Sequence, residues 1–202
     1  MTLRAISILA LLSAALACER ATSPTTPDSS PAVSSPAINI ASTSGGSTTR
    51  VLAQAARADV LVNMLDACDP ATFAAQNITC IRSGGVTFNQ FIAELTRLGF
   101  VGSWHFAPPT ANVQVGQTFV AVNKGGEVHT FTEVEKFGGG IVPALNQLAH
   151  VPAVAPECRA LERDDFVAPG ASYREEVDHA GSLRFQCCIH PWMRLEARAS
   201  TR

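Results

Sequence analysis

Charged residues make up only 16% of this 202-residue chain, and the formal net charge is −2. Because no basic run stands out, the sequence predicts no binding to nucleic acid and no polybasic attachment to anionic lipid. No paired carboxylates and no nucleophile beside a histidine stand out either, so nothing indicates an enzyme. Six cysteines are too few for a small scaffold held together by disulfides, and the position of each one therefore matters.

Residues 1–17 have the pattern of an export signal. Arg4 supplies the positive charge, a short apolar run follows, and residues 15–17 fit a signal peptidase site. Cys18 comes next and resembles the lipidated cysteine of bacterial lipoproteins, although Ala15 stands where Leu is usual. We expect an exported protein, periplasmic or on the outer surface, attached to a membrane only through lipid on Cys18. Ordinary cleavage to a soluble periplasmic product is the alternative.

Residues 18–49 predict a flexible tether. They are mostly Ser, Thr, Pro, Gly and Ala, and large apolar side chains are almost absent. Such a segment cannot bury enough surface to offset the entropy lost on ordering. Behind an anchored cysteine, the tether would let a folded head stand off from a membrane. A cleaved or functionless leader is the alternative.

Residues 50–102 predict a helical extension. Apolar residues at near-helical spacing indicate one helix over 51–65, and a second is expected over 87–98, ended by Gly99. Cys68 and Cys80 lie between the two, close enough to staple the connecting loop by a disulfide in an oxidising compartment. We expect this extension to pack or dock and to carry no chemistry.

From residue 103 to the end, the pattern changes to that of strands. Val113, Val115, Phe119 and Ala121 alternate with polar residues, and Gly116 marks a turn. Further strands are expected over residues 130–134, 172–177 and 183–187. The stretch 137–160, rich in glycine and proline, is expected to be an excursion with one short helix around Leu145. Short strands separated by turns predict a β-sandwich or barrel.

The chemically informative run is 185–193. Its Cys187, His190 and Met193 fall at three-residue intervals on a segment that leaves a strand and rounds a tight loop. A thiolate and a thioether favour Cu(I), while imidazole nitrogen also accommodates Cu(II), so this set suits a copper ion that changes oxidation state. A second imidazole from elsewhere would complete the site. Zinc fits less well because its usual sites do not include methionine.

This run resembles the C-terminal copper loop of the small blue copper proteins, the cupredoxins. Upstream, Phe106-x-Pro108, the alternating run from Val113 to Phe119, and His129-Thr130-Phe131 are similar to the family's first strands and its distant histidine ligand. The resemblance covers residues 104–196. It implies a mainly β, Greek-key cupredoxin-like sandwich. It also implies one type 1 copper ion, with ligands His129, Cys187, His190 and Met193.

Two features depart from the family pattern. The interval from His129 to Cys187 is longer than in the smallest members, which the excursion over 137–160 explains. The doubled cysteine is also unusual, but strand alternation turns Cys188 away if Cys187 faces the metal. Cys188 is then expected to pair with Cys158, since a free thiol beside copper invites oxidation. His105, His150 and His179 are rival imidazoles, and His105 and His179 read as surface or structural residues.

The resemblance implies a one-electron carrier that exchanges electrons with redox partner proteins. The ring edge of His190 is expected at the surface, within an apolar docking patch that includes Pro191 and Trp192. Copper delivery or storage is one alternative, and a cupredoxin-like interaction module without copper is another. A multicopper oxidase or nitrite reductase would need further copper domains and histidine clusters, which this sequence does not show.

Overall fold

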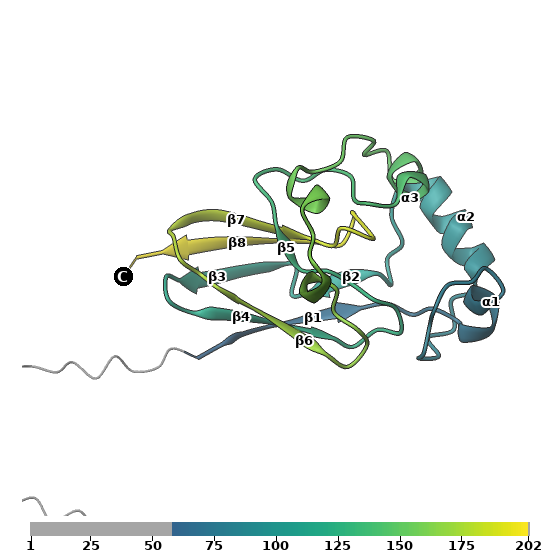
Figure 1. Ribbon diagram of the computed structural model, residues 1–202, viewed down its shortest axis with the longest axis horizontal. Helices are drawn as coiled ribbons and strands as arrows, with labels where there is room; N and C mark the ends of the chain where they lie inside the picture. The colour runs from purple at the N-terminus through teal and green to yellow at the C-terminus, as the bar shows by residue number, and fades with distance from the viewer. Residues whose placement is uncertain (1–57, 202) are drawn as a thin grey trace, which may run out of the picture. The chain divides into compact units, whose positions relative to one another are not determined.

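The computed structural model describes residues 58–201 (Figure 1). The expected export signal, the tether and Cys18 lie outside these described residues, and so does the first part, 51–57, of the helix expected over 51–65. Within 58–201, none of the helices has the length and apolar character needed to cross a membrane.

Two four-stranded sheets face each other. One has the order β2-β1-β4-β6, and the other has the order β3-β8-β7-β5. Pairing is parallel between β1 and β4 and between β3 and β8, and antiparallel elsewhere. The strands are β1 Val60–Leu65, β2 His105–Ala107, β3 Thr110–Gln114, β4 Thr118–Asn123, β5 Thr132–Glu133, β6 Ser172–Glu176, β7 Gly181–Gln186 and β8 Arg194–Ser200. The mainly β sandwich expected from the sequence is confirmed.

The core between the sheets is built from alternate residues of each strand. In β8, Leu195, Ala197 and Ala199 are buried while the residues between them are exposed, because successive side chains of a strand point to opposite faces. Phe131 and Phe185 stack at 4.4 Å between ring centroids, and Phe119 meets Phe185 edge-on at 5.1 Å. These rings pack the two sheets together near the loop that follows β7.

The helix expected over 51–65 is wrong where the structure describes it, because Val60–Leu65 forms strand β1. It lies inside its sheet between β2 and β4, with Val60 opposite Phe119 in a parallel register. Val62 and Met64 are buried and Leu61 is exposed, which is a period of two. A short apolar run fits either period, and pairing with two neighbouring strands decided it. The sandwich therefore begins at β1 and not at residue 103.

The second expected helix is confirmed as α2 (Phe88–Leu98). Thr87 and Gln90 form a capping box at its start, and Gly99 ends it with φ of 77°. A short helix, α1 (Pro70–Ala74), begins at Asp69, whose side chain accepts a hydrogen bond from the amide of Thr72. A disulfide joins Cys68 to Cys80 around α1, as expected.

The excursion 137–160 contains α3 (Pro143–Leu148), which confirms the short helix expected around Leu145, and the single turn η1 (Glu157–Arg159). A further single turn, η2 (Arg163–Asp165), follows it. A second disulfide, Cys158–Cys188, ties η1 to the loop after β7. Figure 1 shows α1, α2 and α3 together at one end of the sandwich, opposite the C-terminal end of β8. The β7–β8 loop also lies at this end.

Candidate metal centre

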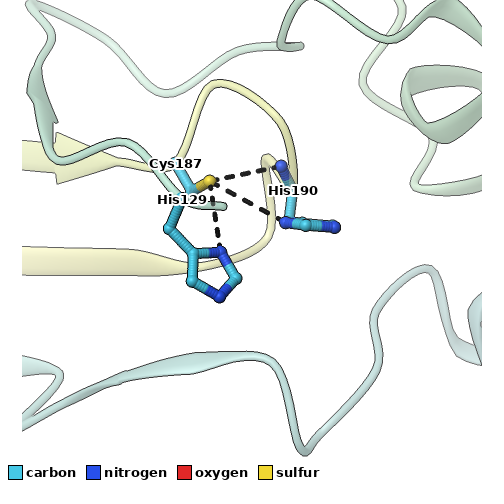
Figure 2. Close-up of side chains that lie close together, drawn as sticks. All are labelled: His129, Cys187 and His190. Atoms are coloured by element: carbon cyan, nitrogen blue, oxygen red, sulfur yellow. Dashed lines mark hydrogen bonds between the residues drawn. The ribbon is translucent and has the colours of Figure 1, made fainter. Parts of the chain in front are cut away.

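Three of the four expected ligand side chains meet at one point. The donor atoms of His129, Cys187 and His190 all lie within 4.8 Å of one another, and all three residues are buried. The Sγ atom of Cys187 is 3.9 Å from the Nδ1 atom of each histidine (Figure 2). The histidine expected to be the distant ligand therefore faces the loop cysteine across 58 positions of sequence.

The β7–β8 loop is held closed by its own backbone. The amide of Met193 donates to the carbonyl of His190 at 2.9 Å, and the amide of Cys187 donates to the carbonyl of Met193 at 3.0 Å. The Cys187 sulfur also accepts hydrogen bonds from the amides of His190 and Thr130, each at 3.4 Å. Met193 is fully buried within this loop.

The cysteines separate into structural and free ones. Within residues 58–201, Cys187 is the one free cysteine, since the other four form Cys68–Cys80 and Cys158–Cys188. Cys188 turns away from the histidines toward a small cluster of its own with Val134 and Ala155. The pairing of Cys158 with Cys188 is the one expected from strand alternation. It leaves a single buried thiol between two imidazoles.

No protein-family model matches the chain, and no curated protein matches it. Among solved structures, it is similar to a purple cupredoxin from Nitrosopumilus maritimus, at 13% identity and a TM-score of 0.40, over 70% of this chain and 100% of that one. It is similar to oxidised plastocyanin from Dryopteris crassirhizoma, at 14% identity and a TM-score of 0.38, over 70% and 100%. It is also similar to a Cu(I) amicyanin variant, at 18% identity and a TM-score of 0.32, over 48% and 73%.

The architecture and the convergence of side chains decide the fold. Two four-stranded sheets enclose one aromatic core, and His129 meets the β7–β8 loop at one end of the sandwich. The fold is cupredoxin-like. In this cupredoxin-like domain, a soft thiolate with two imidazoles is a donor set that fits copper.

The charges around the site favour a thiolate at Cys187. Burial raises the pKa of the Cys187 thiol, but its contacts with His129 and His190 outweigh burial and bring the pKa well below its usual value. Burial lowers the pKa of His129, but its contacts with Asp66 and Cys187 outweigh this and raise the pKa to about 9. A thiolate is the form of cysteine that binds metals.

Sequence reasoning missed Asp66, a buried carboxylate behind His129. Its Oδ2 atom lies 2.9 Å from His129 Nε2, on the far side of the ring from Cys187. Burial raises the pKa of Asp66, but hydrogen bonds from His129 and from the amides of Glu127 and Gly126 outweigh burial and lower the pKa to about 2. Asp66 follows β1 directly. Reading that segment as a helix hid its place beside the site.

Sequence reasoning also missed Glu127, a second buried carboxylate behind the other histidine. Its Oε2 atom lies 3.7 Å from His190 Nε2 and accepts a hydrogen bond from Trp104 Nε1 at 2.7 Å. Burial raises its pKa, partly opposed by the charge of His190 and the Trp104 hydrogen bond. The one available signal was its place two residues before His129. The cluster of Asp66, Cys68 and Glu127 offers no second soft site, because Cys68 is in a disulfide.

The expectation that His190 reaches the surface is wrong. His190 is 3% exposed, Pro191 is buried and Trp192 is half-buried, so these residues form no exposed patch. The rings of Phe91 on α2 and of Trp104 each lie 6.4 Å from the His190 ring, and Trp192 lies 5.5 Å away. The segment between β1 and β2 thus covers the loop histidine. The family resemblance carried no information about this added cover.

The rival imidazoles lie outside the site. His105 is exposed, with its Nδ1 atom 2.9 Å from the carbonyl of Gly102. His179 is exposed beside Asp178 and Glu133. His150 is also exposed and follows α3. Among the described residues, the only histidines within reach of the free thiol are therefore His129 and His190.

Proposed function

We propose that this domain binds one copper ion through His129, Cys187, His190 and Met193 and acts as an exported one-electron carrier. The observation that carries the proposal is the single free thiol of residues 58–201, buried between two imidazole nitrogens that each lie 3.9 Å from it. When bound, copper would supply a Cu(II)/Cu(I) couple. The thiolate and imidazoles are the donors that suit both states, and a buried thioether from Met193 suits a weak axial ligand.

The protein groups around the sulfur would tune this couple. Two backbone amides, of Thr130 and His190, already donate to Cys187 Sγ. Hydrogen bonds to a ligating sulfur and the apolar shell around it adjust the reduction potential. The burial of all three donor residues keeps water from the site.

The scaffold supports a carrier that changes little in shape between states. Cys187 follows β7 directly and the adjacent Cys188 is fixed by a disulfide to η1. The amide of Cys188 donates to Thr130 Oγ1 at 2.8 Å, which ties the residue after His129 to the loop. Ligands held by a rigid shell need little rearrangement when the charge of the site changes.

Export and redox partners complete the proposal. Two disulfides in the described part of the chain favour an oxidising compartment outside the cytoplasm. The proposal includes attachment to a membrane through lipid on Cys18 and exchange of electrons with redox partner proteins. Copper delivery is less favoured, because a protein that hands over its metal needs accessible ligands and His190 is 3% exposed.

The visible and EPR spectra of the copper-loaded protein test this function. We expect an intense blue or purple thiolate charge-transfer band with narrow copper hyperfine splitting. Cys187→Ser should abolish the band, and Cys188→Ser is the matched control that should keep it. A wild-type protein that stays colourless and takes up no copper would leave only the copper-free interaction module. Copper that binds without the band and exchanges readily would favour delivery or storage.

A further inference from the structure

Each histidine of the candidate site has a buried carboxylate on the side of its ring away from Cys187. Asp66 Oδ2 lies 2.9 Å from Nε2 of His129, and Glu127 Oε2 lies 3.7 Å from Nε2 of His190. In both rings, Nδ1 is the atom that faces the sulfur. The two acids come from different parts of the chain, one at the end of β1 and one after β4.

The backbone at Gly125 and Gly126 fixes the position of the Asp66 carboxylate. Its carboxylate accepts hydrogen bonds from the amides of Gly126, at 2.8 and 2.9 Å, and of Glu127, at 3.0 Å. A Cβ atom at Gly125 would lie 1.9 Å from Asp66 Oδ2, so only glycine leaves room there. A carboxylate with 1% of its side chain exposed therefore has donors on one side and His129 on the other.

The segment 66–104, which covers the site, fixes the position of the Glu127 carboxylate. Its Oε2 atom accepts the indole N–H of Trp104 at 2.7 Å. Trp104 in turn packs against Phe91 of α2 at 4.8 Å and stacks on Phe73 of α1 at 6.0 Å between ring centroids. The position of this carboxylate beside His190 is thus set by Trp104, which α1 and α2 hold in place.

We propose that Asp66 and Glu127 are positioning residues, Asp66 through a hydrogen bond to Nε2 of His129 and Glu127 through a longer charge contact with Nε2 of His190, and that the negative charge of Asp66 lowers the reduction potential of the copper site. The proposal rests on the proposed function. A hydrogen-bonded carboxylate fixes the orientation of a ligating imidazole and makes it more basic. A buried negative charge also stabilises the more positive Cu(II) state relative to Cu(I), since its interaction with the site is weakly screened.

Four variants separate orientation from charge. Asp66→Ala removes both the hydrogen bond and the charge, whereas Asp66→Asn keeps an acceptor oxygen without the charge. Glu127→Gln makes the matching change at His190, and Glu196→Gln removes an exposed charge on β8 as the control. Copper affinity is measured by competition with a chelator of known affinity, and the potential by redox titration of the charge-transfer band.

We expect Asp66→Ala to lose about 10–100-fold in copper affinity, the usual cost of removing such an outer partner. Asp66→Asn should recover most of the affinity and still show a raised potential. Glu127→Gln should lose less affinity than Asp66→Ala, because 3.7 Å separates its carboxylate from the ring. Glu196→Gln should match the wild type in both measurements.

The outcomes distinguish this proposal from the proposed function. If the wild type binds copper with the expected band and both Asp66 variants match Glu196→Gln, the positioning role is overturned and the carrier stands. If the wild type binds no copper, both are overturned. If Asp66→Ala does not fold, the potential of Asp66→Asn still decides, and an unchanged value would overturn the role of the charge.

Discussion

The loop 187–193 and the segment 66–104 that covers it differ in how their parts are arranged along the chain. The loop brings three of the four proposed ligands within seven consecutive residues. The cover brings Asp66, Phe91 and Trp104 to the two histidines from three separate places. Most of the proposed ligands are therefore local in sequence, with His129 as the exception, whereas the cover around the histidines depends on packing between distant parts of the chain.

Truncation of the cover should have the largest effect on stability. Phe91→Ala removes a side chain that is 3% exposed and meets His190, Trp104 and Trp192. We expect the free energy of unfolding of the metal-free protein to fall by about 3–5 kcal/mol, from lost burial and the cavity left behind. Urea unfolding followed by fluorescence measures this loss.

The control for the cover is Leu98→Ala at the end of the same helix. Leu98 is 40% exposed, so its truncation should change stability by no more than about 0.5 kcal/mol. In the copper-loaded protein, Phe91→Ala should also speed reduction by a small-molecule reductant, because it uncovers His190. Equal reduction rates in Phe91→Ala and the wild type would show that α2 does not shield the site.

Removal of the disulfide on the loop side should come next in size. Cys158→Ser combined with Cys188→Ser opens a cross-link between residues 30 positions apart. The entropy of the closed loop predicts a loss of about 3–4 kcal/mol in the free energy of unfolding. The charge-transfer band should persist, since Cys187 is untouched. Loss of the band in this double variant would show that the staple also positions the ligands.

Removal of the disulfide in the cover should cost slightly less. Cys68→Ser with Cys80→Ser opens a link between residues only 12 positions apart, which predicts a loss of about 3 kcal/mol. Cys68 follows Asp66 by two residues, and its amide lies 3.3 Å from Asp66 Oδ1. Thermal or urea unfolding of the two double variants, compared side by side, ranks the staples. A larger loss of stability in the Cys68/Cys80 double variant than in the Cys158/Cys188 double variant would contradict the expected order of the two disulfides.

The smallest expected effect is the pH dependence of stability that comes from Asp66 and His129, the pair that joins the cover to the site. The pKa of Asp66 is lowered from 3.8 to about 2. Its contribution to the free energy of unfolding of the metal-free protein is therefore present above pH 3.8 and lost as pH falls through about 2. That contribution amounts to about 2 kcal/mol. The pKa of His129 is raised from 6.5 to about 9. Its contribution to the free energy of unfolding is therefore present below pH 6.5 and lost as pH rises through about 9.

Unfolding of the wild type and of Asp66→Asn across pH checks both directions. The stability difference between them should be largest between pH 4 and 6.5, where both pair members are charged in the folded protein. It should shrink on the acid side of this range and again on the alkaline side. A difference that stays constant from pH 2 to pH 9 would contradict the pairing of Asp66 with His129.

The sequence was sufficient for the β-sandwich and for helix α2. The strands from residue 103 onward have alternating residues and turn signals, and α2 has a capping box at Thr87 and a glycine stop at Gly99. The sequence misled at β1, because a run of six residues, apolar except for Asn63, carries no clear period of its own. Pairing with β2 and β4 supplied the missing information, and such pairing involves partners at least 40 positions away.

By itself, the sequence determined that the loop 187–193 carries a thiol, an imidazole and a thioether, a donor set that suits copper, since this depends on residue type and on spacing within one loop. Only the tertiary structure decided that His190 is covered and that each histidine has its own carboxylate. Those features require contacts such as Asp66 with His129, 63 positions apart, and Trp104 with Glu127. No local pattern encodes such contacts, because they exist only once β1 and the helices after it have packed onto the sandwich.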